Sequence, residues 1–148
     1  MGKHRHRFIN AFSKIKSFPV TGFASADRIA LTLCLMALVA LLSLMPGNSG
    51  GARHGIGQLV DRTPVSLQKV MHVALYAALA LLLVWALEGI QVITYRYLTA
   101  FITAAGFGAL MEWCQTKVPG RFGTVSDVGL NAAGVAIGLL VAVILLKS

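Results

Sequence analysis

Charged residues are scarce in this chain, and acidic residues are the scarcest of them. Of its 148 residues only 12% are charged and 57% are hydrophobic, whereas about a quarter of the residues in soluble domains are charged. Long stretches contain no Arg, Lys or Asp at all. This scarcity excludes an ordinary soluble domain and is typical of a polytopic membrane protein. The length allows one compact domain and no separate soluble one.

Cysteines and recognised catalytic motifs are also few. Cys34 and Cys114 fall at different depths of different apolar runs, so a disulfide between them is not expected. The chain has no nucleophile elbow, no His-Glu-x-x-His, no phosphatase signature and no metal motif, so we expect no metal ion and no cofactor. No zinc-finger or RNA-binding signature accompanies the formal net charge of +8. The basic residues flank apolar segments, which indicates attraction to anionic lipid headgroups rather than to nucleic acid.

Apolar runs that are long enough to cross a membrane make up most of the chain. There are four, at Ile29–Met45, Leu67–Leu87, Ile93–Gln115 and Asp127–Leu146. Ser25 or Asp27 can cap the first run, Pro46 ends it, and Pro119-Gly120 ends the third. Because a transmembrane helix needs about 20 residues, the sequence predicts an all-α fold. Residues 26–148 would form a bundle of four transmembrane helices.

A basic segment without any acid, residues 1–25, precedes the first run. Phe8, Phe12 and Ile15 recur at helical spacing, and Pro19 ends the pattern. The spacing predicts a short amphipathic helix on the membrane surface. A disordered basic tail is the alternative.

Basic residues near the helix ends predict the orientation. With both termini in the cytoplasm, the inner side would hold Lys3, Arg5, Arg7, Lys14, Lys16, Arg28, Arg96 and Lys147. The outer side would hold the smaller set Arg53, Arg62, Lys69, Lys117 and Arg121. We therefore expect a multi-pass protein of the bacterial inner membrane with its N- and C-termini inside.

Polar residues gather where the second and fourth helices begin and the third ends. Eight of them are candidate ligand-binding residues: Lys69, His72, Tyr76, Glu112, Gln115, Arg121, Asp127 and Asn131. On each helix they lie three or four residues apart, so they share one face. Ionisable groups in lipid cost about 2.5–3.5 kcal/mol at a helix centre, so these should face the bundle interior and pair. We expect Glu112 or Asp127 to pair with Lys69, Arg121 or a protonated His72.

Small residues continue two of these faces into the bundle. Gly134 and Gly138 follow Asn131 on the fourth helix at the spacing that lets another helix approach closely. Gly108 and Ala105 continue the face of Glu112 on the third.

Two groups of residues resemble the signatures of VanZ-like membrane proteins. The first is the helix pattern Lys69-x-x-His72-x-x-x-Tyr76-x-x-Leu79. The second combines Glu112-x-x-Gln115, Pro119-Gly120-Arg121, Ser126-Asp127 and Asn131-x-x-Gly134-x-x-x-Gly138, in that order. The resemblance covers residues 67–138. Where the family usually has two Asp residues and a His, this chain has Gln68, Met111 and Cys114, which removes two possible charge partners and one imidazole.

The resemblance implies a protein of the bacterial cell envelope. The family is named for an accessory protein of glycopeptide-resistance clusters that is associated with teicoplanin resistance. For this chain, antibiotic resistance is an implication of similarity only, and the family name does not define a biochemical activity.

Three functional hypotheses follow. The first is a non-enzymatic protein that binds the headgroup of a membrane lipid or a lipid-linked cell-wall precursor, with Arg121 and Lys69 on phosphate. The second is an intramembrane enzyme in which His72 acts as base or nucleophile and Glu112 or Asp127 orients it. The third is a structural or partner-binding protein whose polar residues join helices. The mixed-charge cluster favours the first hypothesis, and the oligomeric state is not predicted.

Overall fold

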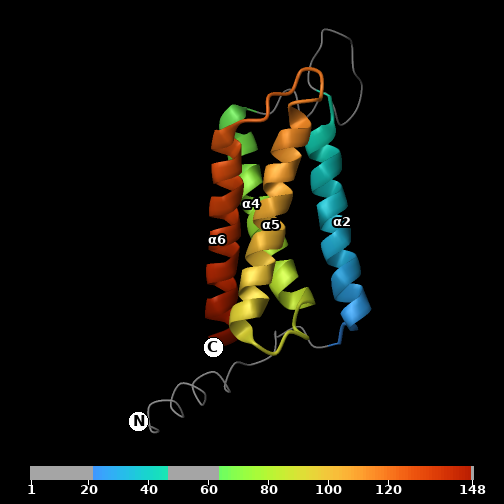
Figure 1. Ribbon diagram of the computed structural model, residues 1–148, viewed down its shortest axis with the longest axis vertical. Coiled ribbons are helices and arrows are strands. Elements are labelled where there is room, and N and C mark those ends of the chain that lie inside the picture. Colours follow the sequence, from blue (N-terminus) through green and yellow to red (C-terminus); the bar gives the residue numbers. More distant parts are fainter. Residues whose placement is uncertain (1–21, 47–63, 148) are drawn as a thin grey trace.

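The computed structural model describes residues 22–46 and 64–147, and these form four α-helices and no strand (Figure 1). The helices are α2 (Ser25–Leu44), α4 (Val65–Ala86), α5 (Ile93–Gln115) and α6 (Val125–Lys147). Each predicted run is therefore a helix, and the bounds of α5 match at both ends. Most of the predicted amphipathic segment and of the loop between the first two runs lies outside the described residues.

Short polar side chains mark where two of the helices begin. The backbone N–H of Ala24 donates to Asp27 Oδ2 at 3.1 Å, so an acid in the first turn closes the start of α2. At α6 the backbone N–H of Asp127 donates to Thr124 Oγ1 at 3.1 Å. Both carboxylates lie at helix N-termini, where the helix dipole stabilises negative charge. Asp27 caps α2 as predicted, though from inside the helix.

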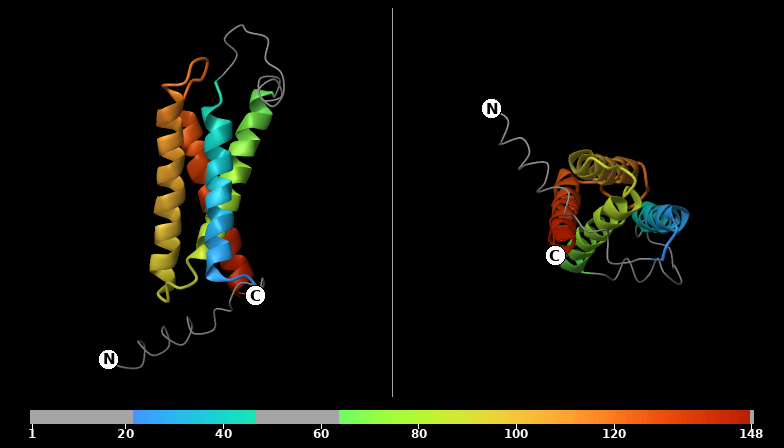
Figure 2. Two further views of the ribbon diagram at one scale, coloured as in Figure 1. Left: turned by 90° about the vertical axis from the view of Figure 1, so that its right-hand side faces the viewer. Right: turned by 90° about the horizontal axis from the view of Figure 1, so that it is seen from below.

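The helices run side by side as an up-and-down bundle, and α4 is its central element (Figures 1 and 2). α4 packs against α2, α5 and α6, while α2 contacts α4 and α5 from the edge of the bundle. The largest fully buried side chains include Tyr76, Leu79 and Val84 of α4 and Val135 of α6. The core therefore follows α4, and the same helix presents residues to every neighbour.

Glycine brings α6 into close contact with α4. A Cβ atom on Gly134 would lie 2.5 Å from the carbonyl oxygen of Val73, and one on Gly138 would overlap the carbonyl of Ala77. The predicted Gly-x-x-x-Gly face is therefore an internal packing surface, and the helix that approaches it belongs to the same chain.

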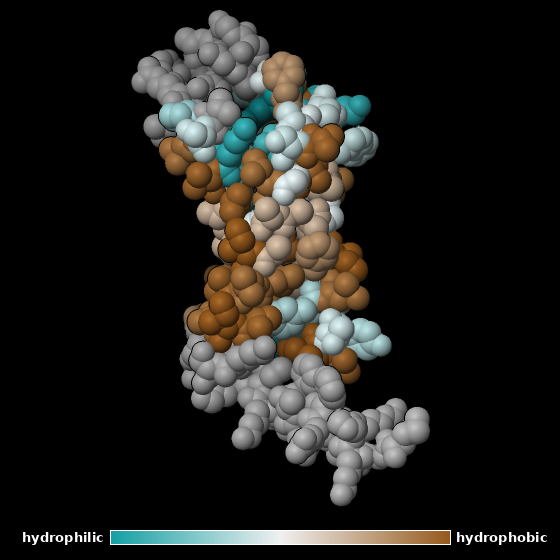
Figure 3. Space-filling model, turned by 90° about the vertical axis from the view of Figure 1, so that its left-hand side faces the viewer, coloured by the Kyte–Doolittle hydropathy of each residue, from teal (hydrophilic) through white to brown (hydrophobic). Residues whose placement is uncertain are grey.

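The outer surface of the bundle is apolar, which suggests a membrane protein. Three helices are long and apolar enough to cross a bilayer: Ser25–Leu44, Ser66–Ala86 and Val125–Leu145. On the face drawn in Figure 3, hydrophobic residues cover much of the middle of the bundle, and hydrophilic ones gather at the end where α4 and α6 begin. α5 is not among the three, and it carries the polar residues Arg96, Glu112 and Gln115. All three of those side chains are buried.

Candidate functional site

The predicted polar residues lie at one end of the bundle. α4 and α6 begin there, and α2 and α5 end there (Figure 1). This arrangement follows from the alternation of helix directions, and it gathers the polar ends of α4, α5 and α6 at one end of the bundle. The loop between α5 and α6, which carries Arg121, closes the same end.

A chain of hydrogen bonds joins α4, α6 and α5 at this end. His72 Nδ1 lies 2.9 Å from Asn131 Oδ1, and Asn131 Nδ2 donates to Glu112 Oε1 at 3.4 Å. Because an amide oxygen only accepts, Nδ1 of His72 must carry the proton. In the neutral ring Nε2 then holds the lone pair. His72 Nδ1 is 3.9 Å from Glu112 Oε1, so the predicted pairing of these two is made mainly through Asn131.

Thr124 connects the two carboxylates of the site. Its backbone N–H donates to Glu112 Oε2 at 3.3 Å, and its hydroxyl donates to Asp127 Oδ2 at 2.7 Å. The preceding residue must be glycine, because a Cβ on Gly123 would collide with the backbone carbonyl of Glu112. Local packing of the α5–α6 loop on α5 therefore holds both acids in place.

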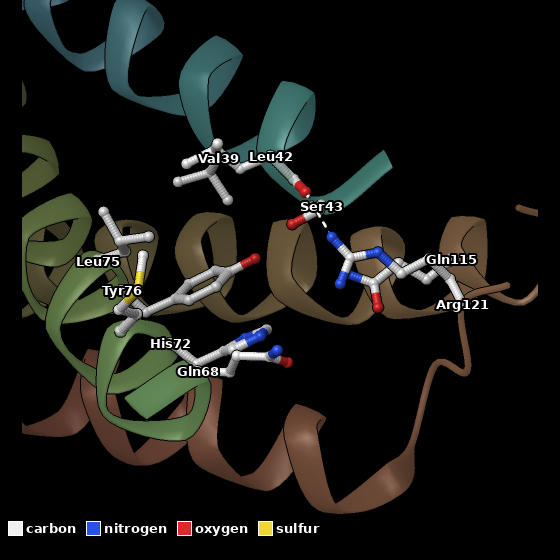
Figure 4. Close-up of a pocket in the computed structure, with 10 residues that line it drawn as sticks. Val39, Leu42, Ser43, Gln68, His72, Leu75, Tyr76, Gln115 and Arg121 are labelled. Atoms are coloured by element: carbon white, nitrogen blue, oxygen red, sulfur yellow. Dashed lines mark hydrogen bonds between the residues drawn. The ribbon is translucent and has the colours of Figure 1, made fainter. Parts of the chain in front are cut away.

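Tyr76 fills the space beneath this network. It is 2% exposed, and a Cβ on Gly108 would be 3.0 Å from its Cε1 atom. The absence of a side chain at Gly108 thus lets the ring pack on α5. The Tyr76 hydroxyl is buried and has no hydrogen-bond partner among the described residues. In Figure 4 it points from α4 toward the side where Ser43 and Arg121 lie.

Arg121 binds the end of α2. Its Nε donates to the carbonyl of Met45 at 3.0 Å. Its Nη2 donates to the carbonyl of Leu42 at 2.9 Å, a bond drawn in Figure 4. The last carbonyls of a helix lack an amide partner within the helix, and a basic side chain can supply one. The expected pair between Arg121 and a carboxylate is therefore not formed, and two of its three nitrogens, Nε and Nη2, bind these carbonyls instead.

Lys69 also differs from the prediction. It is exposed at the start of α4 and makes no ion pair with the described part of the chain. The carboxylate of Asp127 is held by Thr124 instead. Neither predicted cation of the site is therefore neutralised by one of its two acids.

Two pockets open at this end of the bundle. The first, which we call the α2–α4 pocket, has a volume of about 80 Å³ and is lined by Val39, Leu42, Ser43, Gln68, Met71, His72, Leu75, Tyr76, Gln115 and Arg121. The second, the α4–α6 pocket, has a volume of about 320 Å³ and is lined by Gln68, Lys69, His72, Thr124, Ser126 and Asp127. Gln68 and His72 line both pockets, so His72 lies between them. Within the described residues, no group of three or more His, Cys, Asp or Glu side chains could hold a metal ion.

The contribution of α2 was missed by sequence reasoning. Val39, Leu42 and Ser43 form one wall of the α2–α4 pocket, and no polar stripe marks that face of the helix. One signal was available. Pro46 ends α2 at the end of the bundle where α4 begins, so the end of α2 lies beside the polar ends of the other helices.

Comparison with known proteins gives one match. A family model described as VanZ/LLP1 matches residues 20–146. That range includes α2, α4 and α5, nearly all of α6, and every predicted ligand-binding residue. No curated protein and no solved structure matches the chain significantly.

Proposed function

The chain belongs to the VanZ/LLP1 family, and from that premise we propose that it binds an anionic lipid headgroup in the bacterial inner membrane. The headgroup is that of a phospholipid or of a lipid-linked cell-wall precursor. Binding takes place at the polar end of the bundle, which faces the outer leaflet when both termini are cytoplasmic.

We propose that α5 is the fourth transmembrane helix. It has 23 residues, as does α6, which at 1.5 Å per residue gives about 35 Å, enough to cross the hydrocarbon core. Its three most polar long side chains, Arg96, Glu112 and Gln115, are buried. Their burial supports a crossing helix, because lipid then meets mainly the apolar surface of α5.

The main observation in support of headgroup binding is that neither Arg121 nor Lys69 forms an ion pair with a carboxylate of the described residues. Arg121 lines the α2–α4 pocket and Lys69 lines the α4–α6 pocket, and the two pockets meet at His72. Glu112 and Asp127 are satisfied by Asn131 and Thr124. With the acids occupied, a phosphate from outside the protein is the natural partner for the cations. Arg121 keeps Nη1 available, since that nitrogen makes no hydrogen bond to the described residues.

Substitution of Lys69 tests this proposal, with Lys117 as matched control. Lys117 is exposed at the same end but lies 6.0 Å from the ring of Trp113 and lines neither pocket. In lipid nanodiscs, binding of phosphatidylglycerol over phosphatidylcholine is measured by native mass spectrometry. Lys69→Met should weaken selective binding at least about tenfold, because it removes a charge-assisted hydrogen bond to the phosphate, which is worth about 1.5–3 kcal/mol. Lys117→Met should change it by less than about twofold. Equal losses would indicate general surface attraction, and no selectivity in the unaltered protein would favour a structural role.

An intramembrane enzyme that acts on a lipid headgroup is the second candidate. It is favoured by the orientation of His72, whose Nδ1 is held by Asn131 so that Nε2 can accept a proton in a neutral ring. Mass spectrometry of phosphorylated lipids incubated with the purified protein tests this candidate. Turnover that disappears in His72→Gln would support it, and the absence of product from any such lipid would argue for binding alone.

Resistance to teicoplanin is a hypothesis that follows from the family alone. Expression in a susceptible host should raise the inhibitory concentration of teicoplanin if it applies. An unchanged concentration would restrict the proposal to lipid binding.

A further inference from the structure

The α2–α4 pocket has a polar end and an apolar wall. Ser43, Gln68 and Gln115 line it near the ends of their helices, and Arg121 lines it from the α5–α6 loop. Val39, about one helical turn deeper than Ser43, and Leu75, about two turns deeper than Gln68, begin the apolar part. The order from polar to apolar runs from the membrane face inward, as it does in a lipid molecule of the same leaflet.

The apolar part of this pocket reaches the side of the bundle. Met71 lines the pocket and is nevertheless 43% exposed, on the outer surface of α4. Leu42 faces it from α2 and is partly exposed. Because the surface at this depth is apolar, hydrocarbon can pass between α2 and α4 without meeting a charged side chain.

A buried polar group faces the pocket without a partner. The hydroxyl of Tyr76 makes no hydrogen bond among the described residues, although the side chain is almost fully buried. Buried hydroxyl groups are normally hydrogen-bonded, and leaving one unsatisfied is costly. A ligand oxygen in the pocket would satisfy it, together with Arg121 Nη1.

We propose that the α2–α4 pocket holds the first few methylene groups of one hydrocarbon chain of a phosphate-bearing lipid, which enters sideways from the membrane. This inference deepens the proposed headgroup function and rests on it. The phosphate lies at Arg121 and Tyr76, and the chain lies against Val39, Leu42, Met71 and Leu75. A volume of about 80 Å³ is several times the 10–15 Å³ that one water needs, so it holds a few methylene groups of one chain only.

Lysophosphatidate with an oleoyl chain and a photoreactive diazirine in that chain tests this placement. After illumination in nanodiscs, crosslinked peptides are mapped by mass spectrometry. We expect crosslinks concentrated at 39–42 of α2 and 71–75 of α4. Crosslinks spread evenly over all lipid-facing helices would overturn the inference, because they would describe ordinary boundary lipid.

One pair of tryptophan variants fills the pocket, and a second pair on neighbouring positions is its matched control. Leu42→Trp and Met71→Trp fill the pocket, whereas Leu41→Trp and Val70→Trp place the same side chain on positions that are 68% and 62% exposed and line no part of it. The pocket-filling variants should weaken lysophosphatidate binding about tenfold, the change that 1.4 kcal/mol produces. The two outward variants should bind as the unaltered protein does.

The outcomes separate this inference from the proposed function. If all four tryptophan variants bind lysophosphatidate normally while Lys69→Met still weakens binding, the headgroup site stands and the chain pocket is wrong. If glycerol 3-phosphate displaces lysophosphatidate at equal concentration, the chain contributes nothing and the inference fails. If the unaltered protein does not distinguish lysophosphatidate from lysophosphatidylcholine, both proposals fail. Crosslink mapping on the unaltered protein decides the matter if the pocket-filling variants do not fold.

Discussion

Asn131 is the residue on which the polar network depends. It is 1% exposed, accepts a hydrogen bond from His72 and donates one to Glu112. An amide is suited to this position because it offers an acceptor and a donor on one planar group. A carboxylate there would add a second negative charge beside Glu112, and an aliphatic side chain would satisfy neither neighbour.

Replacement of Asn131 by Leu, which has a similar shape, should destabilise the protein. The buried Glu112 Oε1 would lose a partner at a cost of about 1–3 kcal/mol, and the half-buried His72 Nδ1 would lose one at a smaller cost. Thermal unfolding in detergent measures the effect, with Ile137→Leu on the outer surface of the same helix as control. A melting temperature equal to that of the control would mean that the network does not stabilise the fold.

At the residue scale, the sequence predicted that His72, Glu112 and Asn131 gather at one end of the bundle, but not which partner each polar side chain takes. The spacing of His72, Glu112 and Asn131 placed them on facing sides of three helices, and the structure joins them. The partners of Arg121 could not be predicted, because they are backbone carbonyls at the end of α2. Arg96 behaves similarly, since its Nε donates to the carbonyl of Val84 in the last turn of α4 at 2.6 Å. Sequence spacing describes side-chain faces and says little about which helix end lies beside a given guanidinium.

At the scale of elements, the α4–α6 pair determines how the site is assembled. Gly134 and Gly138 allow the two helix backbones to approach, which brings His72 of α4 within hydrogen-bond distance of Asn131. The helix bounds were predictable because Pro and Gly interrupt otherwise continuous apolar runs. The packing role of α2 was not, because its pocket-facing and lipid-facing residues are equally aliphatic.

Alanine substitutions on α6 should separate close packing from helix propensity. Gly138→Ala adds a Cβ that overlaps the carbonyl of Ala77, so the helices must separate. A cost of about 1–3 kcal/mol is typical of such overpacking. Gly129→Ala, in the same helix, has open space around its Cβ and should be neutral or stabilising by up to about 1 kcal/mol, because Ala favours helix. Thermal unfolding of both variants provides the measurement, and equal melting temperatures would show that the close approach of α4 and α6 is not required.

At the scale of the whole molecule, function depends on how the bundle lies in the membrane. Lys117 follows α5 at the end that carries the candidate site, and Gly89 precedes it at the other end. The basic residues predict that the Lys117 side is outside. If α5 crosses the bilayer, these two positions face different compartments.

Cysteine labelling in intact cells tests both parts of this arrangement. Cys34 and Cys114 are first replaced by Ala, and single cysteines are then introduced as Lys117→Cys or Gly89→Cys, both at exposed positions. A membrane-impermeant maleimide should label the Lys117 variant in intact cells and the Gly89 variant only after the membrane is opened.

The reverse pattern would mean that the N-terminus is outside, which would move the candidate site to the cytoplasmic leaflet but leave the bundle intact. Labelling of both variants from the same side would show that α5 does not cross. The polar helix ends would then no longer share one membrane face, and the lipid-binding site proposed there would lose its physical basis.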